Sequence, residues 1–311
     1  SDEAQVAYQG NRIEPFVHLL PSPVSAFGSG YRRAIKPDII FYGGRQWYRE
    51  HLPSTDPVTI ETVNYCIAPG NKVASPGKFP GELRNTSYSR GTSNATALIS
   101  RAAGICYDSL QQIFNEQAAE VDPSNYEVPL LKAMLIHGSS WGDIGSQLSD
   151  VLRTPGNGHQ LKGLISRWIG YGVPRVDRVL DCTEQRATLL GFGQLSNGEA
   201  HVFSLPLPPS LSARPEWRRL TVTLAWLSPI SPNRNASLWF EINNDRLTLS
   251  RSDADRNAVR RGTVQHEVFE GQSADPFIDG ERLEIKVNCR KDAGIIPNPV
   301  AYGLVVSLEV A

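Results

Sequence analysis

The sequence holds 311 residues, of which 40% are hydrophobic and 20% charged, with a formal net charge of −1. This charge balance excludes a nucleic-acid footprint and a polybasic membrane patch, so we expect no nucleic-acid partner. No apolar run approaches the roughly 20 residues that span a bilayer, so no membrane partner is expected either.

The first part of the chain carries mostly loop signals. Proline and glycine are frequent at the start, and Lys36–Gly44 then predicts a short buried strand that ends in a glycine turn. From Arg45 to Arg90 the sequence is loop-like, with one strand expected over Val58–Ile67. A long irregular stretch of this kind is where a substrate cleft is often built.

Gly91, Thr92 and Ser93 form a turn of small residues directly before a helical pattern. From Ala95 to Phe114 the apolar residues recur at spacings of three and four, which indicates one buried helical face. Ser93 is therefore expected at a helix N-terminus, where unpaired N–H groups would stabilise the oxyanion of an acyl-transfer reaction. The alternative is that Ser93 or Thr92 simply caps the helix, and the motif alone leaves both interpretations open.

Two shorter helical segments follow. Asp122-Pro123 breaks the pattern, and Pro129 in a first turn opens a helix that Gly138 closes. Leu161–Leu180 predicts a turn at Gly170-Tyr171-Gly172 and a last short helix.

From about residue 183 the pattern changes to a period of two. Leu220–Trp226, Leu283–Cys289 and, less strictly, Leu304–Val310 alternate between apolar and polar residues. Such runs between turn residues predict an antiparallel β-sandwich with one face of each strand buried. We therefore expect two domains, 1–182 and 183–311, of which the second folds on its own around a central strand at Leu220–Trp226.

The cysteines and the acidic loops suggest neither a disulfide nor a metal. Cys66, Cys106, Cys182 and Cys289 form no CxxC pattern and are predicted to be reduced core thiols, which favours a cytoplasmic location. The run from Asp275 to Glu281 offers oxygen ligands for calcium. A hairpin turn explains that run better, so no metal or other cofactor is expected.

Five motifs together resemble the subtilases, the subtilisin-like serine peptidases. Gly91-Thr92-Ser93 with the following Asn-Ala-Thr-Ala is similar to the family's nucleophile motif. The other four landmarks occur in the family's order, over roughly residues 20 to 180: Ser25–Gly28, Lys36-Pro37-Asp38, Leu131–Leu135 and Gly170–Pro174. The resemblance implies that 1–182 is the C-terminal half of an α/β domain with a parallel sheet. It also implies a hydrolase that cleaves protein or peptide substrates through an acyl-enzyme at Ser93, with Gly91 and Thr92 at the oxyanion hole and substrate cleft.

The second part of the chain is similar to large bacterial subtilases that continue into a jelly-roll-like sandwich. Arg219–Trp226 and Tyr302–Val310 resemble strands of that sandwich. Some members of that branch are thought to work beside an AAA-type ATPase in defence against phage, which the resemblance implies as a partner here.

The sequence departs from the family in one essential respect. A subtilase needs an aspartate and a histidine before its serine, and neither the aspartate-threonine-glycine nor the histidine-glycine-threonine motif is present. Gln9-Gly10-Asn11 is the nearest candidate for the family's oxyanion asparagine, in poor context, and every histidine, including His137, is expected to be structural. Because Ser1 stands where a methionine is usual, we expect a fragment whose missing N-terminal half supplies both residues, so that this chain alone is inactive.

Two other functional classes remain as alternatives. A degenerate subtilase half and a sandwich would serve as a non-catalytic protein-binding module. An α/β-hydrolase-like esterase is disfavoured because Gly91-Thr92-Ser93 lacks the Gly-x-Ser-x-Gly elbow.

Overall fold

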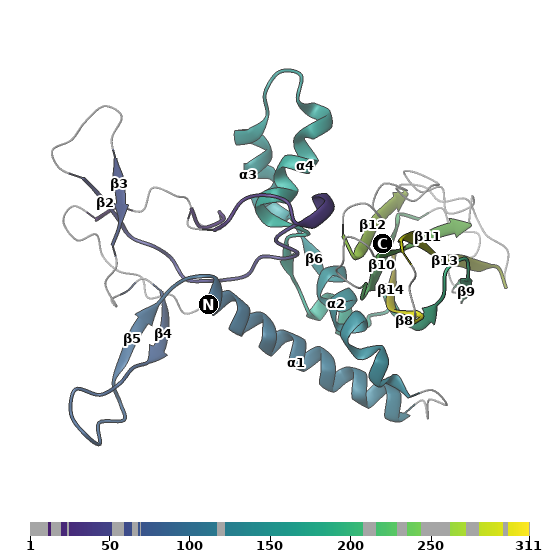
Figure 1. Ribbon diagram of the computed structural model, residues 1–311, viewed down its shortest axis with the longest axis horizontal. Coiled ribbons are helices and arrows are strands. Elements are labelled where there is room, and N and C mark those ends of the chain that lie inside the picture. Colours follow the sequence, from purple (N-terminus) through teal and green to yellow (C-terminus); the bar gives the residue numbers. More distant parts are fainter. Residues whose placement is uncertain are drawn as a thin grey trace.

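The computed structural model describes residues 12–13, 20–23, 25–51, 59–63, 68, 70–116, 122–207, 216–228, 235–243, 262–271, 280–294 and 298–310. Figure 1 shows a long helix, a group of shorter helices and a compact β-sandwich. The helices are α1 (Thr92–Glu116), α2 (Glu127–His137), α3 (Gly142–Leu152), α4 (Gly158–Ile169) and α5 (Asp177–Leu180), with single 3-10 turns at Tyr31–Arg33 and Pro123–Asn125. The strands before the sandwich are β1 (Arg12–Ile13), β2 (Tyr48–Glu50), β3 (Ile60–Thr62), β4 (Asn71–Ala74), β5 (Thr86–Ser89), β6 (Ser139–Ser140) and β7 (Val173–Pro174). Those of the sandwich are β8 (Arg186–Leu195), β9 (Ala200–Pro206), β10 (Arg218–Trp226), β11 (Asn235–Asn243), β12 (Val264–Gly271), β13 (Arg282–Ala293) and β14 (Val300–Val310).

The sandwich consists of a four-stranded sheet in the order β12-β10-β14-β8 and a three-stranded sheet in the order β11-β13-β9. Alternate residues of β10 face the second sheet, because Leu220, Val222, Leu224 and Trp226 are all fully buried in the core between the two sheets. This confirms the predicted inner face and the central place of β10. The finer likeness to a jelly roll stays a prediction.

The outer face of the four-stranded sheet is buried as well, which the sequence analysis did not expect. Helix α2 packs against β10 and β14 with its apolar residues Leu130, Ala133 and Ile136 (Figure 1). The contact is close at Gly303 of β14, where an added Cβ would lie 2.7 Å from the backbone nitrogen of Leu130. The helical part and the sandwich therefore share a core, and independent folding of 183–311 stays a prediction.

Helix α1 has the predicted apolar spacing, but only part of the predicted face is buried. Its buried residues, Cys106, Leu110 and Phe114, lie in its second half. In the first half Leu98 is 36% exposed, and Ile105, near the middle, is 43% exposed. Helix α2 is thus the centre of the helical core, because it is the helix that the sheet covers.

The strand pairs of the described residues are all antiparallel, so the parallel sheet expected for 1–182 is not found among them. Lys36–Gly44 is mostly half-buried, but it is not part of a sheet, so the strand predicted there was wrong. Ile60–Thr62 is a strand inside the predicted Val58–Ile67 range. Figure 1 shows β2, β3 and the β4–β5 hairpin at the far side of α1 from the sandwich.

Predictions for the later helices and the cysteines have mixed outcomes. The helix from Pro129 to Gly138 and the turn at Gly170-Tyr171-Gly172 are confirmed, whereas α3 was not predicted. Cys106 and Cys289 are buried thiols that form no disulfide with a described residue, but Cys182 is exposed, so its assignment to the core was wrong. Cys66 lies outside the described residues, as does most of the Asp275–Glu281 run.

No described helix has the length and hydropathy that crossing a bilayer requires.

Candidate functional site

Ser93 lies in an exposed turn at the start of the longest helix. Helix α1 begins at Thr92, so Gly91 stands at the cap position and neither Thr92 nor Ser93 caps the helix. As the second residue of α1, Ser93 has an amide N–H that helix geometry leaves without an intrahelical acceptor. Its side chain is exposed, so the hydroxyl and a free N–H lie together at the positive end of the helix dipole.

Segment 38–44 holds this turn in place through hydrogen bonds to its carbonyl at Gly43. The N–H of Gly91 donates to the carbonyl of Gly43 at 2.8 Å, and Nδ2 of Asn94 donates to the same carbonyl at 3.3 Å. A Cβ on Gly43 would lie 2.8 Å from the carbonyl oxygen of Gly91. Only glycine lets the two backbones approach so closely, and the approach fixes the position of the turn that carries Ser93.

The other end of the same segment is attached to the turn after α4. The N–H of Tyr171 donates to the carbonyl of Asp38 at 2.8 Å, and the N–H of Ile40 donates to Gly172 at 3.0 Å. The segment thus joins two landmarks that are far apart in the sequence, the turns at Gly91 and at Gly170. A third landmark, Leu131–Leu135, lies within α2, where Lys132 Nζ donates to Thr263 Oγ1 at 2.7 Å.

No histidine accompanies Ser93 in the part of the chain that the structure describes. No hydrogen bond joins Ser93 to any described histidine, and His51 and His159 are exposed on other elements. His201 Nδ1 is hydrogen-bonded to the Tyr302 hydroxyl at 2.7 Å, and His18 lies outside the described residues. The geometry therefore offers a serine and an anion-stabilising N–H, but no base beside them.

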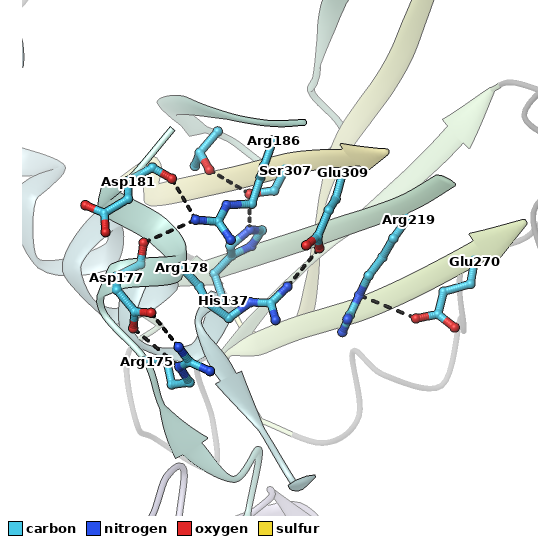
Figure 2. A network of polar contacts seen from close by, with 11 residues as sticks. His137, Arg175, Asp177, Arg178, Asp181, Arg186, Arg219, Glu270, Ser307 and Glu309 are labelled. Carbon is cyan, nitrogen blue, oxygen red and sulfur yellow. Dashed lines mark hydrogen bonds and ion pairs between the residues drawn. The ribbon is translucent and has the colours of Figure 1, made fainter. Parts of the chain in front are cut away.

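A second group of polar residues, which the sequence analysis missed, lies on the outer face of the four-stranded sheet (Figure 2). One in-register row of this face crosses all four strands as Glu270, Arg219, Glu309 and Arg186. The next row along the strands is Val268, Thr221, Ser307 and Thr188. Acidic and basic side chains alternate in the first row, which places opposite charges on adjacent strands.

His137, the last residue of α2, lies over this polar end of the sheet. Its Nε2 is 2.7 Å from Ser307 Oγ and its Nδ1 is 2.9 Å from Thr223 Oγ1. The chain of hydrogen bonds continues from Thr223 Oγ1 to His266 Nδ1 at 2.7 Å and from Ser307 Oγ to Thr188 Oγ1 at 2.8 Å. Two histidines and three hydroxyls thus form one continuous chain between α2 and the sheet.

Both histidines of this chain are held in the neutral form. Burial lowers the pKa of His137 well below its ordinary value, with further contributions from the neighbouring His266 and from the positive charges of Arg178, Arg219 and Arg186. Burial, and then the charge of Arg219, lowers the pKa of His266 to about 4. A neutral imidazole carries one N–H donor and one acceptor, which suits its place between hydroxyl groups.

Three arginines surround a small pocket at the seam of α2, α5 and the sheet, which we call the seam pocket; its lining includes His137, His266, Arg178, Arg186, Arg219 and Ser307. Arg178 pairs with Glu309 at 2.8 Å, and Arg219 pairs with Glu270 at 3.5 Å. Arg186 instead donates from Nη2 to the backbone carbonyls of Asp181, at 2.7 Å, and Asp177, at 3.4 Å. Figure 2 shows these side chains converging from three elements.

The alternation of apolar and polar residues in β10 predicts that its polar residues face solvent, whereas several of them belong to this polar group. In β10 the residues between the core positions are Arg219, Thr221, Thr223 and Ala225, and Thr223 is fully buried. Small hydroxyl residues and alanine in these places leave room for a helix. Their meaning depends on the register with β12 and β14, which no single strand reveals.

The described residues contain no group of three or more histidine, cysteine or carboxylate side chains placed to hold a metal ion. No family model matches the sequence, and no curated protein matches it. Among solved structures, the chain is similar to a chain of the capsid asymmetric unit of cyanophage Pam1, with 10% identity over 41% of this chain and 83% of that chain. The TM-score of 0.23 is too low for this likeness to support an argument about fold or function.

Proposed function

We propose that Ser93 is the acylated nucleophile of a subtilisin-like serine endopeptidase. The observation that carries the proposal is that one segment connects the turn of Ser93 to a second motif that is far away in the sequence. The segment after Lys36-Pro37-Asp38 touches the Gly91 turn at one end and the Gly170 turn at the other, through four backbone or amide hydrogen bonds. A hydrolase benefits from such bracing because the nucleophile must be held in place relative to the substrate carbonyl.

In this proposal the N–H of Ser93 supplies one donor of the oxyanion hole, and Gly91 and Thr92 border the substrate cleft. The histidine base, its aspartate and the second oxyanion donor belong to the N-terminal half of the peptidase domain, which completes a parallel sheet beside segment 38–44. The protein then hydrolyses peptide bonds in protein substrates. A cytoplasmic location and work beside an AAA-type ATPase belong to the same proposal.

The test is labelling with a fluorophosphonate probe, which modifies activated serines. The 311-residue chain is compared with the complete product of its gene, each as wild type, as Ser93→Ala and as Ser100→Ala. Ser100 is a matched control because it is an exposed serine two turns further along α1, where its hydroxyl donates to the carbonyl of Thr96 at 2.9 Å.

We expect the complete product to be labelled at Ser93 and to hydrolyse casein, and we expect Ser93→Ala alone to abolish both. The chain by itself is expected to react slowly or not at all, since a serine without a base is a poor nucleophile. A complete product that folds but resists the probe would overturn the peptidase proposal in favour of a protein-binding module.

A further inference from the structure

The seam pocket contains a positive charge that the surrounding residues leave uncompensated. Three arginines line it, and the carboxylates within reach are Glu309, which pairs with Arg178, and Glu270, which pairs with Arg219. Arg186 forms no ion pair with any residue that the structure describes, and backbone carbonyls hold its Nη2. Asp177, close to Arg186 in the chain fold, directs its carboxylate to Arg175 at 2.7 Å instead (Figure 2).

One nitrogen of Arg186 is buried without a partner. Its Nε forms no hydrogen bond with any described residue, although it is shielded from solvent. A buried donor left in this way is costly, and a bound ion or water is one way in which folded proteins satisfy such a group. A guanidinium is also the side chain best suited to oxyanions, because its N–H groups match two oxygens at once.

His266 adds a second donor at the same place. Its Nδ1 is occupied by Thr223, whereas its Nε2 forms no hydrogen bond within the described part of the chain. When Thr223 donates to Nδ1, the single proton of the neutral imidazole lies on Nε2 and is available to a ligand in the pocket. The lining hydroxyl of Thr221 can donate as well.

We propose that the seam pocket binds a small oxyanion of the phosphate class, with Arg186 as its main charged partner. The excess of positive charge selects an anion, and the guanidinium of Arg186 is suited to an oxyanion because it can bind two oxygens at once. The anion is either free inorganic phosphate or the phosphoryl group of a phosphomonoester. This site is separate from Ser93 and does not depend on the peptidase proposal.

The proposal predicts how the histidines respond to the ligand. An anion beside His266 opposes the positive field that keeps both imidazoles neutral, so its binding should move their pKa values upward. It should also change the NMR signals of the His266 and His137 rings. The exposed His159 lies on α4, away from the pocket, and serves as the internal control.

The experiment is calorimetric titration of the 311-residue chain with inorganic phosphate, and separately with O-phosphoserine, at constant ionic strength set with chloride. We compare wild type with Arg186→Gln and with Arg153→Gln. The Arg153 variant changes the net charge equally, but it removes an exposed guanidinium at the end of α3 that does not line the pocket. Saturable binding of phosphate that Arg186→Gln weakens about tenfold or more and Arg153→Gln leaves unchanged supports the proposal.

Binding of O-phosphoserine as well identifies a phosphoryl group as the ligand, and binding of phosphate alone identifies the free anion. If Arg186→Gln fails to fold, the wild-type NMR titration decides. Selective shifts of the His266 and His137 signals then support the site, and their absence overturns it. No saturation by phosphate, or equal loss in both arginine variants, also overturns the proposal.

Discussion

Ser307 Oγ lies 2.7 Å from Nε2 of His137, and this hydrogen bond joins the last strand of the sandwich to the C-terminal end of α2. His137 is 6% exposed and Ser307 is 6% exposed, so water does not compete for the contact. Together with the bond from Thr223 to Nδ1, it satisfies both imidazole nitrogens. A residue at the end of a helix thus fixes the helical part to the sheet.

Replacing His137 with alanine should therefore destabilise the protein markedly. The change removes one hydrogen bond from each of Thr223 and Ser307, which keep their bonds to His266 and Thr188, and it opens a cavity. Together these losses should lower the free energy of unfolding by about 2–4 kcal/mol. His159→Ala, on an exposed part of α4, should change it by less than about 0.5 kcal/mol. Urea unfolding followed by circular dichroism measures both, and equal midpoints would contradict the structural role of His137.

The stability of the seam should fall as the pH is lowered. The folded state holds His137 and His266 neutral, with the pKa of His266 at about 4, whereas in the unfolded chain both take up protons near pH 6.5. The unfolded state thus binds more protons, so the free energy of unfolding falls as the pH is lowered. The contribution of the two histidines is complete above about pH 7 and decreases below pH 6.5 by about 1.4 kcal/mol per pH unit for each histidine.

Urea unfolding at a series of pH values between neutrality and the acid limit of folding tests this slope. The double variant His137→Gln/His266→Gln has no titrating group in the seam and should show a shallower dependence. A double variant with the wild-type slope would assign the acid sensitivity to other groups.

Val222 of β10 tests the inner core of the sandwich. Val222→Asp places a carboxylate in a fully buried position between the sheets, which should lower the free energy of unfolding by several kcal/mol. Val202 of β9 is a matched control because it is 58% exposed, so Val202→Asp should have little effect. Thermal unfolding distinguishes them, and a Val222→Asp protein that melts like wild type would refute the assigned facing of β10.

Local patterns in the sequence predicted strands β10, β13 and β14 and helices α1 and α2, because each depends on the periodicity of a single segment. The inner face of β10 follows directly from Leu220, Val222, Leu224 and Trp226. The sequence of β10 does not predict that α2 covers the opposite face of the sheet, because threonines such as Thr221 and Thr223 occur both at solvent-exposed positions and in buried polar contacts. The predicted parallel sheet came from the family resemblance and not from any strand pattern, and the described strands do not form it.

The two candidate sites also differ in how far the sequence predicts them. The turn at Ser93 was predictable because Gly91 and the helical pattern are adjacent in the sequence. The seam pocket was not predictable, because Arg178, Arg186 and Arg219 come from three elements and meet only through the register of β8, β10 and β14. Isolated histidines and arginines carry no pattern that distinguishes this arrangement from ordinary surface charge.

The last prediction concerns the bracing of Ser93. In Gly43→Ala the new methyl group would lie 2.8 Å from the carbonyl oxygen of Gly91, so either segment 38–44 or the serine turn must move. If Ser93 is the nucleophile, a displacement of this kind should slow its reaction with the fluorophosphonate probe on the order of 100-fold in the complete gene product. Because Gly43 lies far from the sandwich core, the same change should leave the circular dichroism spectrum unchanged.

Gly104→Ala is the matched control for this experiment. Gly104 lies on the exposed side of α1, where an added Cβ meets no atom within 4 Å. Alanine there should stabilise the helix by about 0.5–1 kcal/mol and leave the labelling rate unchanged. Because both changes add one methyl group, a difference between them isolates the contact with Gly91. Equal labelling rates in the two folded variants would show that the close approach of Gly43 does not position Ser93.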